Sequence, residues 1–274
     1  MKKLKVFSTV LVFSFLFILS ACGTSQNGSQ SSGSQKTDAK KTLRVVTDAS
    51  YAPFEYMDKG QIVGFDVDFV NAVAKEAGYK VNIENVGWDP LFVEIKGKTA
   101  DIGMSAITIN DERKQTYDFS SPYFLSTNMI LVPKGSSIKS ADDLKGKVVA
   151  VQNGTTGQAV VENILGKNSP NVKKFENNNL AIMELKDGGA SAVVADNTVV
   201  EAYAKNNPSD KLKTISDTKN FAKEYYGLMF PKGSKLEADF NKAIGKVLND
   251  GTYAKIYKQW FKTNPDLKTL KAQQ

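Results

Sequence analysis

The sequence predicts an α/β protein in which parallel sheets carry helices on both faces. Strand-like and helix-like segments alternate from Thr42 to about residue 107, and the alternation resumes after about residue 130. Repeated alternation of this kind is typical of parallel sheets with helical crossovers. The chain has 274 residues, of which 41% are hydrophobic and 24% charged, so it is long enough for one large domain or two lobes.

The first run of elements is expected at residues 43–47, 66–77, 81–86, 89–97 and 101–107, in the order strand, helix, strand, helix, strand. Asp66 is the predicted N-cap of the first helix, whose apolar residues recur at helical spacing until Gly78 ends it. Asp89 is the predicted N-cap of the second helix, with Pro90 in its first turn and Gly97 at its end.

The second run of elements is expected as a strand at 147–151, a helix after residues 154–157, a helix at 178–187, a strand at 192–195 and a helix at 197–205. The C-terminal part is predicted to be helical. Ser234 and Glu237 have the spacing of a capping box at the start of one helix. Gly251 ends that helix, and Thr252 starts the last helix of the chain.

The first 22 residues have the organisation of an export signal. Three lysines precede an apolar run at residues 6–19, which as a helix would span only about 21 Å, less than a hydrocarbon core of roughly 30 Å. A signal peptide at residues 1–22 is therefore favoured over an uncleaved membrane anchor. The run ends in Leu-Ser-Ala-Cys, which resembles the bacterial lipobox and makes Cys22 the expected lipidation site.

Cys22 is the only cysteine, so no internal disulfide can form. A free cysteine near the cleavage site is the alternative to lipidation. Two acyl chains on Cys22 would anchor the protein stably to a membrane. Residues 23–41 are rich in Ser, Gly, Gln and Lys and cannot form a core, so they are predicted to be a flexible tether.

Several classes of function are disfavoured by what the sequence lacks. There is no histidine, hence no imidazole base and no histidine-ligated metal. There is also no phosphate-binding loop, dinucleotide fingerprint or nucleophile elbow, so we expect no cofactor and no metal. An enzyme that uses only carboxylates stays open, but the sequence singles out no pair of them, and we expect no enzymatic activity. Six of the 36 basic residues and one of the 29 acidic residues precede Thr42, which leaves 30 and 28 in the folded part. This near-neutral balance argues against nucleic-acid binding.

Arginine usage gives the clearest internal indication of a binding site. Only Arg44 and Arg113 are arginines among the 36 basic residues. Arg113 is therefore a candidate for a position that needs a rigid fork, such as bidentate binding of a carboxylate. A structural ion pair with Asp111, Glu112 or Asp118 is the alternative.

Other candidates follow predicted strands. Tyr51 and Trp88 each lie just past a strand end, where α/β folds bind ligands, and could enclose an aliphatic or cationic side chain. Packing at the rim of the core is the alternative for both. Residues 154–157 enter a helix directly, and its free N–H groups would suit a carboxylate. Asp196 could pair with an ammonium group or merely cap the next helix.

Several segments together resemble the polar amino-acid-binding proteins of ABC importers, solute-binding protein family 3. They are Val-Thr-Asp-Ala-Ser-Tyr-Ala-Pro-Phe-Glu-Tyr at 46–56, Gly-Phe-Asp-Val-Asp at 64–68, Ala-Ile-Thr-Ile-Asn-Asp-Glu-Arg at 106–113, Asp-Phe-Ser at 118–120 and Asn-Asp-Gly-Thr-Tyr at 249–253. The resemblance covers residues 42–264 and is greatest to members that bind basic amino acids. It implies a type II periplasmic-binding-protein fold with a ligand cleft between two lobes.

The implied lobes are residues 42–124 plus 226–264 and residues 127–222, joined by two crossovers that suit hinge closure. The resemblance also implies roles for single residues. Arg113, with the backbone N–H groups of Thr108 and Thr156 and the Thr108 hydroxyl, would bind the α-carboxylate of an amino acid. Asp196 and the Ala106 carbonyl would bind its α-ammonium group.

Tyr51 and Trp88 would flank the ligand side chain, and Asp48 would lie near its end. Gln152 stands where glutamine-binding members often carry a cation, so a cationic ligand is not repelled. Arginine, lysine or histidine is therefore the preferred ligand. Glutamine is the alternative, followed by an enzyme resembling cyclohexadienyl dehydratases on the same fold. The implied protein is a membrane-anchored, extracytoplasmic monomer that serves the permease and ATPase subunits of an ABC importer.

Overall fold

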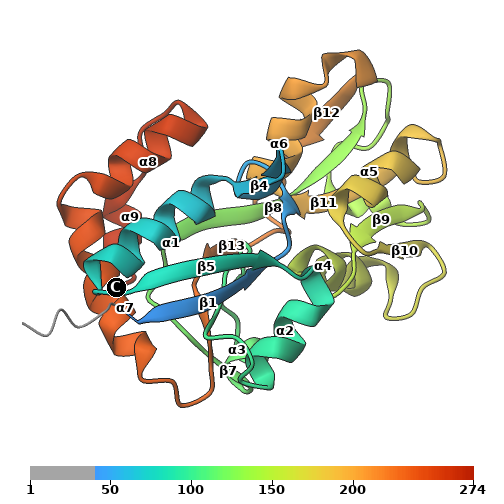
Figure 1. Cartoon of the computed structure of the whole chain (residues 1–274). Coiled ribbons are helices and arrows are strands. Elements are labelled where there is room, and N and C mark those ends of the chain that lie inside the picture. The colour runs from blue at the N-terminus through green and yellow to red at the C-terminus, as the bar shows by residue number, and fades with distance from the viewer. Residues whose placement is uncertain (1–40) are drawn as a thin grey trace, which may run out of the picture. The chain divides into compact units, whose positions relative to one another are not determined.

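The computed structural model describes residues 41–274 (Figure 1). The predicted signal peptide and the predicted lipidation site Cys22 lie outside the described residues, as does the predicted tether except for Lys41. None of the helices within residues 41–274 combines the length and the apolar character needed to cross a membrane.

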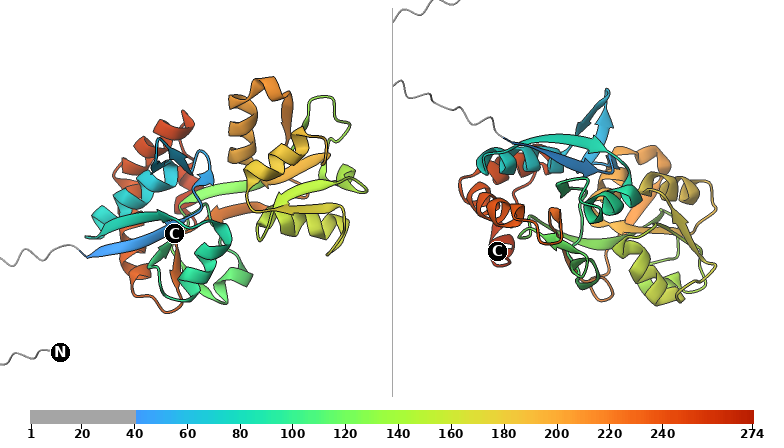
Figure 2. Two further views of the ribbon diagram at one scale, coloured as in Figure 1. Left: turned by 45° about the vertical axis from the view of Figure 1, so that its right-hand side comes forward. Right: turned by 60° about the horizontal axis from the view of Figure 1, so that its bottom comes forward.

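Two sheets form the framework of the described part, one in each lobe (Figure 2). The first has the order β5-β1-β6-β14-β7, and its strands are β1 (Thr42–Thr47), β5 (Lys80–Asn85), β6 (Ile102–Gly103), β7 (Tyr117–Phe119) and β14 (Met229–Pro231). The second has the order β10-β9-β11-β8-β12 with β13 paired to β8, and its strands are β8 (Phe124–Pro133), β9 (Val149–Gln152), β10 (Val172–Phe175), β11 (Ala192–Asp196), β12 (Leu212–Ile215) and β13 (Lys223–Tyr226). The predicted α/β class with two lobes is confirmed.

The smaller elements surround these sheets. The helices are α1 (Phe65–Glu76), α2 (Trp88–Lys96), α3 (Asp111–Lys114), α4 (Thr156–Leu165), α5 (Asn178–Lys186), α6 (Asn197–Asn206), α7 (Leu236–Asn249), α8 (Thr252–Phe261) and α9 (Leu267–Lys271). A third, small sheet contains β2 (Ser50–Tyr51), β3 (Glu55–Asp58) and β4 (Gln61–Val63), and two 3-10 turns cover Ala141–Leu144 and Pro208–Asp210. The prediction that Thr252 starts the last helix is wrong, because α9 follows α8.

The prediction of parallel sheets holds only in part. β1 runs parallel to β5 and β6, and β9 runs parallel to β10 and β11. β14 is antiparallel to β6 and β7, and β8 is antiparallel to β11, β12 and β13. The reason is that neither strand arises from a βαβ unit, since β8 carries the chain from the first lobe to the second and β14 follows its return through β13. The predicted strand at 101–107 is also shorter, with only Ile102–Gly103 paired.

Three predicted helix caps are wrong. Asp66 does not cap α1, whose N-cap is Gly64; a Cβ there would lie 1.9 Å from the Phe54 carbonyl oxygen, so the position requires glycine. Asp89 does not cap α2, which begins one residue earlier, with Gly87 as its N-cap.

The predicted capping box at α7 is not formed either. The N-cap of α7 is Lys235, and no side chain caps the helix. The Ser234 hydroxyl instead accepts a hydrogen bond at 3.3 Å from the N–H of Leu236, two residues further along the chain. All three predicted caps fail for the same reason. The spacing of residues in the sequence identifies a candidate cap but does not determine where its side chain points.

The chain passes from the first sheet to the second through β8 and returns through β13. These two strands pair antiparallel, from Thr127 opposite Lys223 to Phe124 opposite Tyr226. Two adjacent crossovers of this kind act as a hinge between lobes. The exact lobe bounds of 42–124 plus 226–264 and 127–222 stay predictions.

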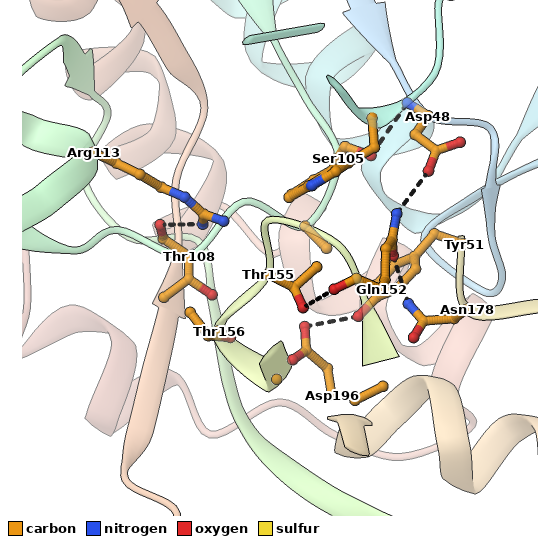
Figure 3. Close-up of a pocket in the computed structure, with 14 residues that line it drawn as sticks. Asp48, Tyr51, Ser105, Thr108, Arg113, Gln152, Thr155, Thr156, Asn178 and Asp196 are labelled. Carbon is orange, nitrogen blue, oxygen red and sulfur yellow. Dashed lines mark hydrogen bonds between the residues drawn. The ribbon is translucent and has the colours of Figure 1, made fainter. Parts of the chain in front are cut away.

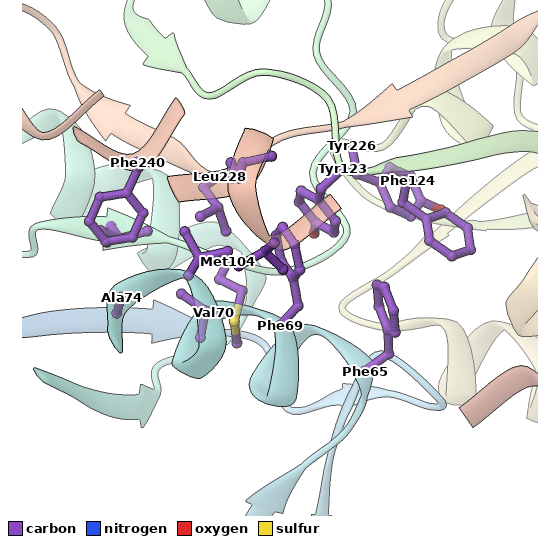
Figure 4. Close-up of a cluster of buried hydrophobic side chains, with 14 of the residues drawn as sticks. Phe65, Phe69, Val70, Ala74, Met104, Tyr123, Phe124, Tyr226, Leu228 and Phe240 are labelled. Carbon is purple, nitrogen blue, oxygen red and sulfur yellow. The ribbon is translucent and has the colours of Figure 1, made fainter. Parts of the chain in front are cut away.

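The cores of the two lobes differ in kind. The first lobe packs α1, α7 and α8 around buried aromatic rings (Figure 4), with Phe69 and Tyr123 stacked at a centroid distance of 4.5 Å. The second lobe has an aliphatic core on each face of its sheet, such as Ile130 and Val194 on one face and Leu131 and Val193 on the other. A sheet that is covered on both faces reads as a continuous apolar run, as residues 192–195 do.

Candidate functional site

One pocket between the lobes gathers every residue to which the family resemblance gave a role in ligand binding (Figure 3). Its lining includes Asp48, Tyr51, Trp88, Ala106, Thr108, Arg113, Gln152, Thr156 and Asp196. Asp48 and Thr156 are 108 positions apart in the sequence, so only the tertiary fold brings them together.

The fold places these residues at strand ends and helix starts. Asp48 follows β1, Gln152 ends β9 and Asp196 ends β11. Trp88 and Thr156 are the first residues of α2 and α4. Parallel strands present their carboxyl ends at one edge of a sheet, and in this protein both edges face the same pocket.

Arg113 lies at one end of the pocket and is held from several directions (Figure 3). Its guanidinium group donates to the Thr108 carbonyl at 2.8 Å and, across the cleft, to the Gly154 carbonyl at 3.2 Å. The guanidinium carbon lies 5.6 Å from the centroid of Trp88 and 5.3 Å from that of Phe92. Cation–π contacts of this kind suit arginine better than lysine.

Arg113 makes no ion pair within 4 Å in the described part of the chain, and Asp118 pairs with Lys232 instead. The structural ion pair that the sequence left open is therefore not formed. Burial lowers the pKa of Arg113, and the negative charges of Glu224 and Asp196 oppose that shift. A half-buried cation without a paired carboxylate is suited to an anionic group of a ligand.

Asp196 is the buried acid of the second lobe, with only 7% of its surface exposed. Its side chain makes no capping hydrogen bond to α6, so the capping alternative is not what the structure shows. The carboxylate instead accepts hydrogen bonds from the Tyr51 hydroxyl at 2.8 Å and the Tyr226 hydroxyl at 2.5 Å. Burial, with the nearby charge of Glu224, raises the pKa of Asp196 to about 7.

Asp48 and Gln152 meet across the opposite end of the pocket (Figure 3). The Gln152 amide donates to the Asp48 carboxylate at 3.2 Å, and the Asn178 amide donates to the Gln152 side-chain oxygen at 2.7 Å. Asp48 and Gln152 are 7% and 2% exposed. Burial raises the pKa of Asp48, while hydrogen bonds from Ser50 and Gln152 oppose the shift.

A buried polar network under the pocket holds the segment that contains Ala106. The Ala106 N–H donates to the Asp66 carboxylate at 2.9 Å, and the Tyr123 hydroxyl donates to the same oxygen at 2.7 Å. The Ser105 hydroxyl donates to the Glu55 carboxyl group at 2.8 Å. Burial raises the pKa of Asp66 to about 6 and that of Glu55 well above its usual range, and the negative charge of Asp66 adds to the shift of Glu55.

This network supports an unusual backbone at the pocket. Ala106 has φ of 46°, in the left-handed region that residues other than glycine rarely adopt. Such strain persists where surrounding contacts over-determine it and is common at binding sites.

Sequence reasoning missed three residues that line the pocket, Ser105, Asn178 and Ala195, whereas Thr155 and Gly157 belong to the indicated segment 154–157. Ser105 and Ala195 each adjoin a residue that was identified, so neighbourhood in sequence was the available signal. Asn178, at the start of α5, carried no such signal.

Glu224 was also missed, and it lies on the crossover strand β13. Its carboxylate accepts hydrogen bonds from the hydroxyls of Thr108 at 2.7 Å and Thr156 at 2.8 Å, and from the Asn128 amide at 2.6 Å. Nothing in the local sequence Ala-Lys-Glu-Tyr-Tyr marks it, because Thr108 is 116 positions away.

The donor set does not favour a metal. Residues 41–274 contain no cluster of three or more histidine, cysteine or carboxylate side chains placed to hold an ion. The pocket instead combines one guanidinium, two buried carboxylates at separate positions and two aromatic rings. Such an arrangement can bind a molecule that carries both an anionic and a cationic group.

Comparison with known proteins gives matches over nearly the whole described part. Residues 43–263 match the model of the bacterial extracellular solute-binding proteins, family 3. A probable histidine-binding protein of Neisseria gonorrhoeae is 41% identical over 246 residues, which cover 89% of this chain and 90% of that protein. The arginine-binding extracellular protein ArtP of Bacillus subtilis (strain 168) is 36% identical over 251 residues, which cover 89% of this chain and 93% of that protein.

Among solved structures, the arginine-, lysine-, histidine-binding protein ArtJ from Geobacillus stearothermophilus matches with a TM-score of 0.83 at 55% identity. The match covers 84% of this chain and 100% of that chain.

Proposed function

The chain belongs to the bacterial extracellular solute-binding proteins, family 3, and from this premise we propose that it binds a free basic L-amino acid for an ABC importer. Arginine, lysine and histidine are the preferred ligands. The three relatives described above are named for binding histidine, arginine, or arginine, lysine and histidine, which supports this choice, although other relatives are named for L-cystine or glutamine. The pocket itself supports it independently through its charges.

One observation carries the proposal: a single pocket has an unpaired guanidinium from the first lobe and a buried carboxylate from the second lobe. Arg113 takes the α-carboxylate of the ligand, with the backbone N–H groups of Thr108 and Thr156. Asp196 takes the α-ammonium group, with the carbonyl of Ala106. A zwitterion bound in this way bridges the lobes and favours the closed state.

The far end of the pocket selects the side chain. Tyr51 and Trp88 flank the aliphatic part, and Asp48 lies at the end opposite Arg113 (Figure 3). Gln152 is neutral, so the Asp48 carboxylate is left to attract a cationic ligand group. Glutamine would gain no such attraction.

A thermal-shift panel of the twenty amino acids on the full-length chain in detergent tests the proposal. A ligand at about 100 times its dissociation constant stabilises the folded state by about 2.7 kcal/mol. Arginine, lysine or histidine should give the largest shifts. A panel without any shift, or one in which glutamine gives the largest, would contradict the proposal.

We further propose that Cys22 carries a lipid and holds the protein, as a monomer, on the outer side of the cell membrane. From there it delivers its ligand to the importer's permease without changing it chemically. Cys22→Ala should release the protein from the membrane fraction, whereas Ser20→Thr should not. Recovery of unaltered ligand after incubation checks that no reaction occurs.

A further inference from the structure

We propose that Glu224 is a positioning residue for the ligand's α-ammonium group. The inference rests on the proposed function, because it assigns a role within the same pocket. Glu224 does not line the pocket. It lies behind two residues that do, and it acts on the ligand through them.

The direction of two hydrogen bonds carries the argument. A threonine hydroxyl has one proton, and a carboxylate has none to give. The hydroxyls of Thr108 and Thr156 lie 2.7 and 2.8 Å from the same Glu224 oxygen, so both hydroxyl protons point at Glu224. Each hydroxyl therefore offers only lone pairs to the pocket.

This arrangement reassigns the hydroxyl of Thr108. It cannot donate to a ligand carboxylate while its proton is held by Glu224, so only the backbone N–H remains for that purpose. Its lone pairs can accept a hydrogen bond from an ammonium group. The Thr108 hydroxyl then acts with the Ala106 carbonyl and Asp196 on the cationic end of the ligand.

Glu224 also contributes charge at this end of the pocket. Its other oxygen accepts from the Asn128 amide at 2.6 Å, which fixes the carboxylate in place. The Glu224 charge opposes ionisation of Asp196, and hydrogen bonds from Tyr226 and Tyr51 and the charge of Arg113 favour it. A second fixed negative charge near Asp196 increases the attraction for an ammonium group.

The location on β13 adds a link to hinge closure. Thr108 belongs to the first lobe and Thr156 to the second, and Glu224 lies on the strand through which the chain passes between them. A single carboxylate thus orients one hydroxyl from each lobe when the cleft is closed.

Truncated ligands separate this role from a merely structural one. Arginine, agmatine (no carboxylate) and 5-guanidinopentanoate (no ammonium) would be titrated against the full-length protein by tryptophan fluorescence, since Trp88 lines the pocket. Glu224→Gln should weaken the affinity for arginine and for agmatine by about tenfold, equivalent to about 1.4 kcal/mol. It should change the affinity for 5-guanidinopentanoate by less than about threefold, because that ligand has no ammonium group to lose contact with.

Two further variants complete the experiment. Glu224→Asp keeps the charge and should retain most of the selectivity for ligands with an ammonium group. Glu237→Gln makes the same charge change on α7, outside the pocket, and should leave all three ligands unaffected.

An equal loss for all three ligands, or no loss for any, overturns the inference while arginine binding by the wild type keeps the proposed function intact. If the wild-type protein binds no amino acid, the proposed function fails and this inference fails with it. If Glu224→Gln does not fold, the Glu224→Asp variant provides the test. An equal loss of affinity for all three ligands in that variant contradicts a role of the Glu224 charge.

Discussion

The two lobes hold their site residues by different means. In the first lobe, the Ala106 segment is supported from beneath by buried carboxyl groups, and Arg113 is fixed through carbonyl oxygens and aromatic rings. In the second lobe, Gln152, Thr156 and Asp196 stand at strand ends and a helix start above aliphatic cores.

The difference also extends to charge. The first lobe supplies the cation Arg113, and the second lobe supplies the buried acid Asp196. Each is partly satisfied by a neutral group from the other side, since Arg113 donates to Gly154 and Asp196 accepts from Tyr51. Closure of the cleft therefore already gives the charged group of each lobe a hydrogen-bond partner in the other lobe. A ligand must replace these contacts with stronger ones.

The sharpest way to break the comparison is to remove the cation of the first lobe. Arg113→Ala should weaken arginine binding by roughly 2–5 kcal/mol, because the ligand carboxylate would be buried without its partner. Isothermal titration calorimetry measures the loss. Arg113→Lys should recover only part of it, since lysine lacks the planar fork. Affinity like that of the wild type in Arg113→Ala would refute the role of this residue.

Removing the acid of the second lobe should have the next largest effect. Asp196→Asn should weaken arginine binding by roughly 2 kcal/mol at pH 7. The cost is smaller than for Arg113 because the pKa of Asp196 is raised to about 7 in the empty protein, so part of the wild-type population must lose a proton before it binds the ammonium group. Binding to the wild type should therefore weaken as the pH falls below 7, with proton release measurable by titration in buffers of different ionisation enthalpy.

Stability of the ligand-free protein should follow the opposite trend with pH. The raised pKa of Asp196 means that the folded protein keeps a proton that the unfolded chain has lost between about pH 4 and pH 7. This group's contribution to the free energy of unfolding should thus fall as pH rises, by up to about 1.4 kcal/mol per unit. The difference between wild type and Asp196→Asn in urea unfolding isolates it, with Asp187→Asn on the exposed end of α5 as control.

A smaller effect is expected where the lobes meet around the ligand side chain. Gln152→Lys places a cation beside Asp48 and should weaken the affinity for arginine by about tenfold, or about 1.4 kcal/mol. The affinity for glutamine should be less affected. Competition between the two ligands measures the change in preference. Gln259→Lys on α8 adds the same charge outside the pocket and should not alter it. An unchanged preference in Gln152→Lys would show that Asp48 does not attract the side chain.

The smallest effect should come from one neutral contact between the lobes. Tyr51→Phe keeps the ring but removes the hydroxyl that donates to Asp196, at a cost of about 1 kcal/mol in arginine affinity at pH 7. Loss of that hydrogen bond also raises the pKa of Asp196 further, so the pH midpoint of binding should shift upward. Tyr56→Phe, outside the pocket, is the matched control. A downward shift would contradict the assigned contact.

Much of the fold was predictable from local sequence. The alternation of apolar segments gave most of the strands and helices, and the rarity of arginine singled out Arg113. The strand directions were not predictable in this way, since the antiparallel pairing of β14 with β6 and β7 depends on the return of the chain from the second lobe.

Side-chain direction was the other feature that sequence could not give. Asp66 has the local pattern of a helix cap, yet it is a fully buried acceptor for Ala106 and Tyr123. Glu224 and the left-handed backbone of Ala106 depend on partners more than 35 positions away. Local propensity contains no information on such contacts.

The position of β14 has a consequence for how the chain folds during synthesis. Met229 of β14 pairs with Gly103 on one side and Phe119 on the other, so this late strand joins two parts of an early sheet. A ribosome must therefore translate about five-sixths of the 274 codons before the first lobe's sheet can close. The second lobe, whose strands lie between Phe124 and Tyr226, needs no residue from outside that interval to complete its sheet. The part of the protein that is made first is thus the part that finishes folding last.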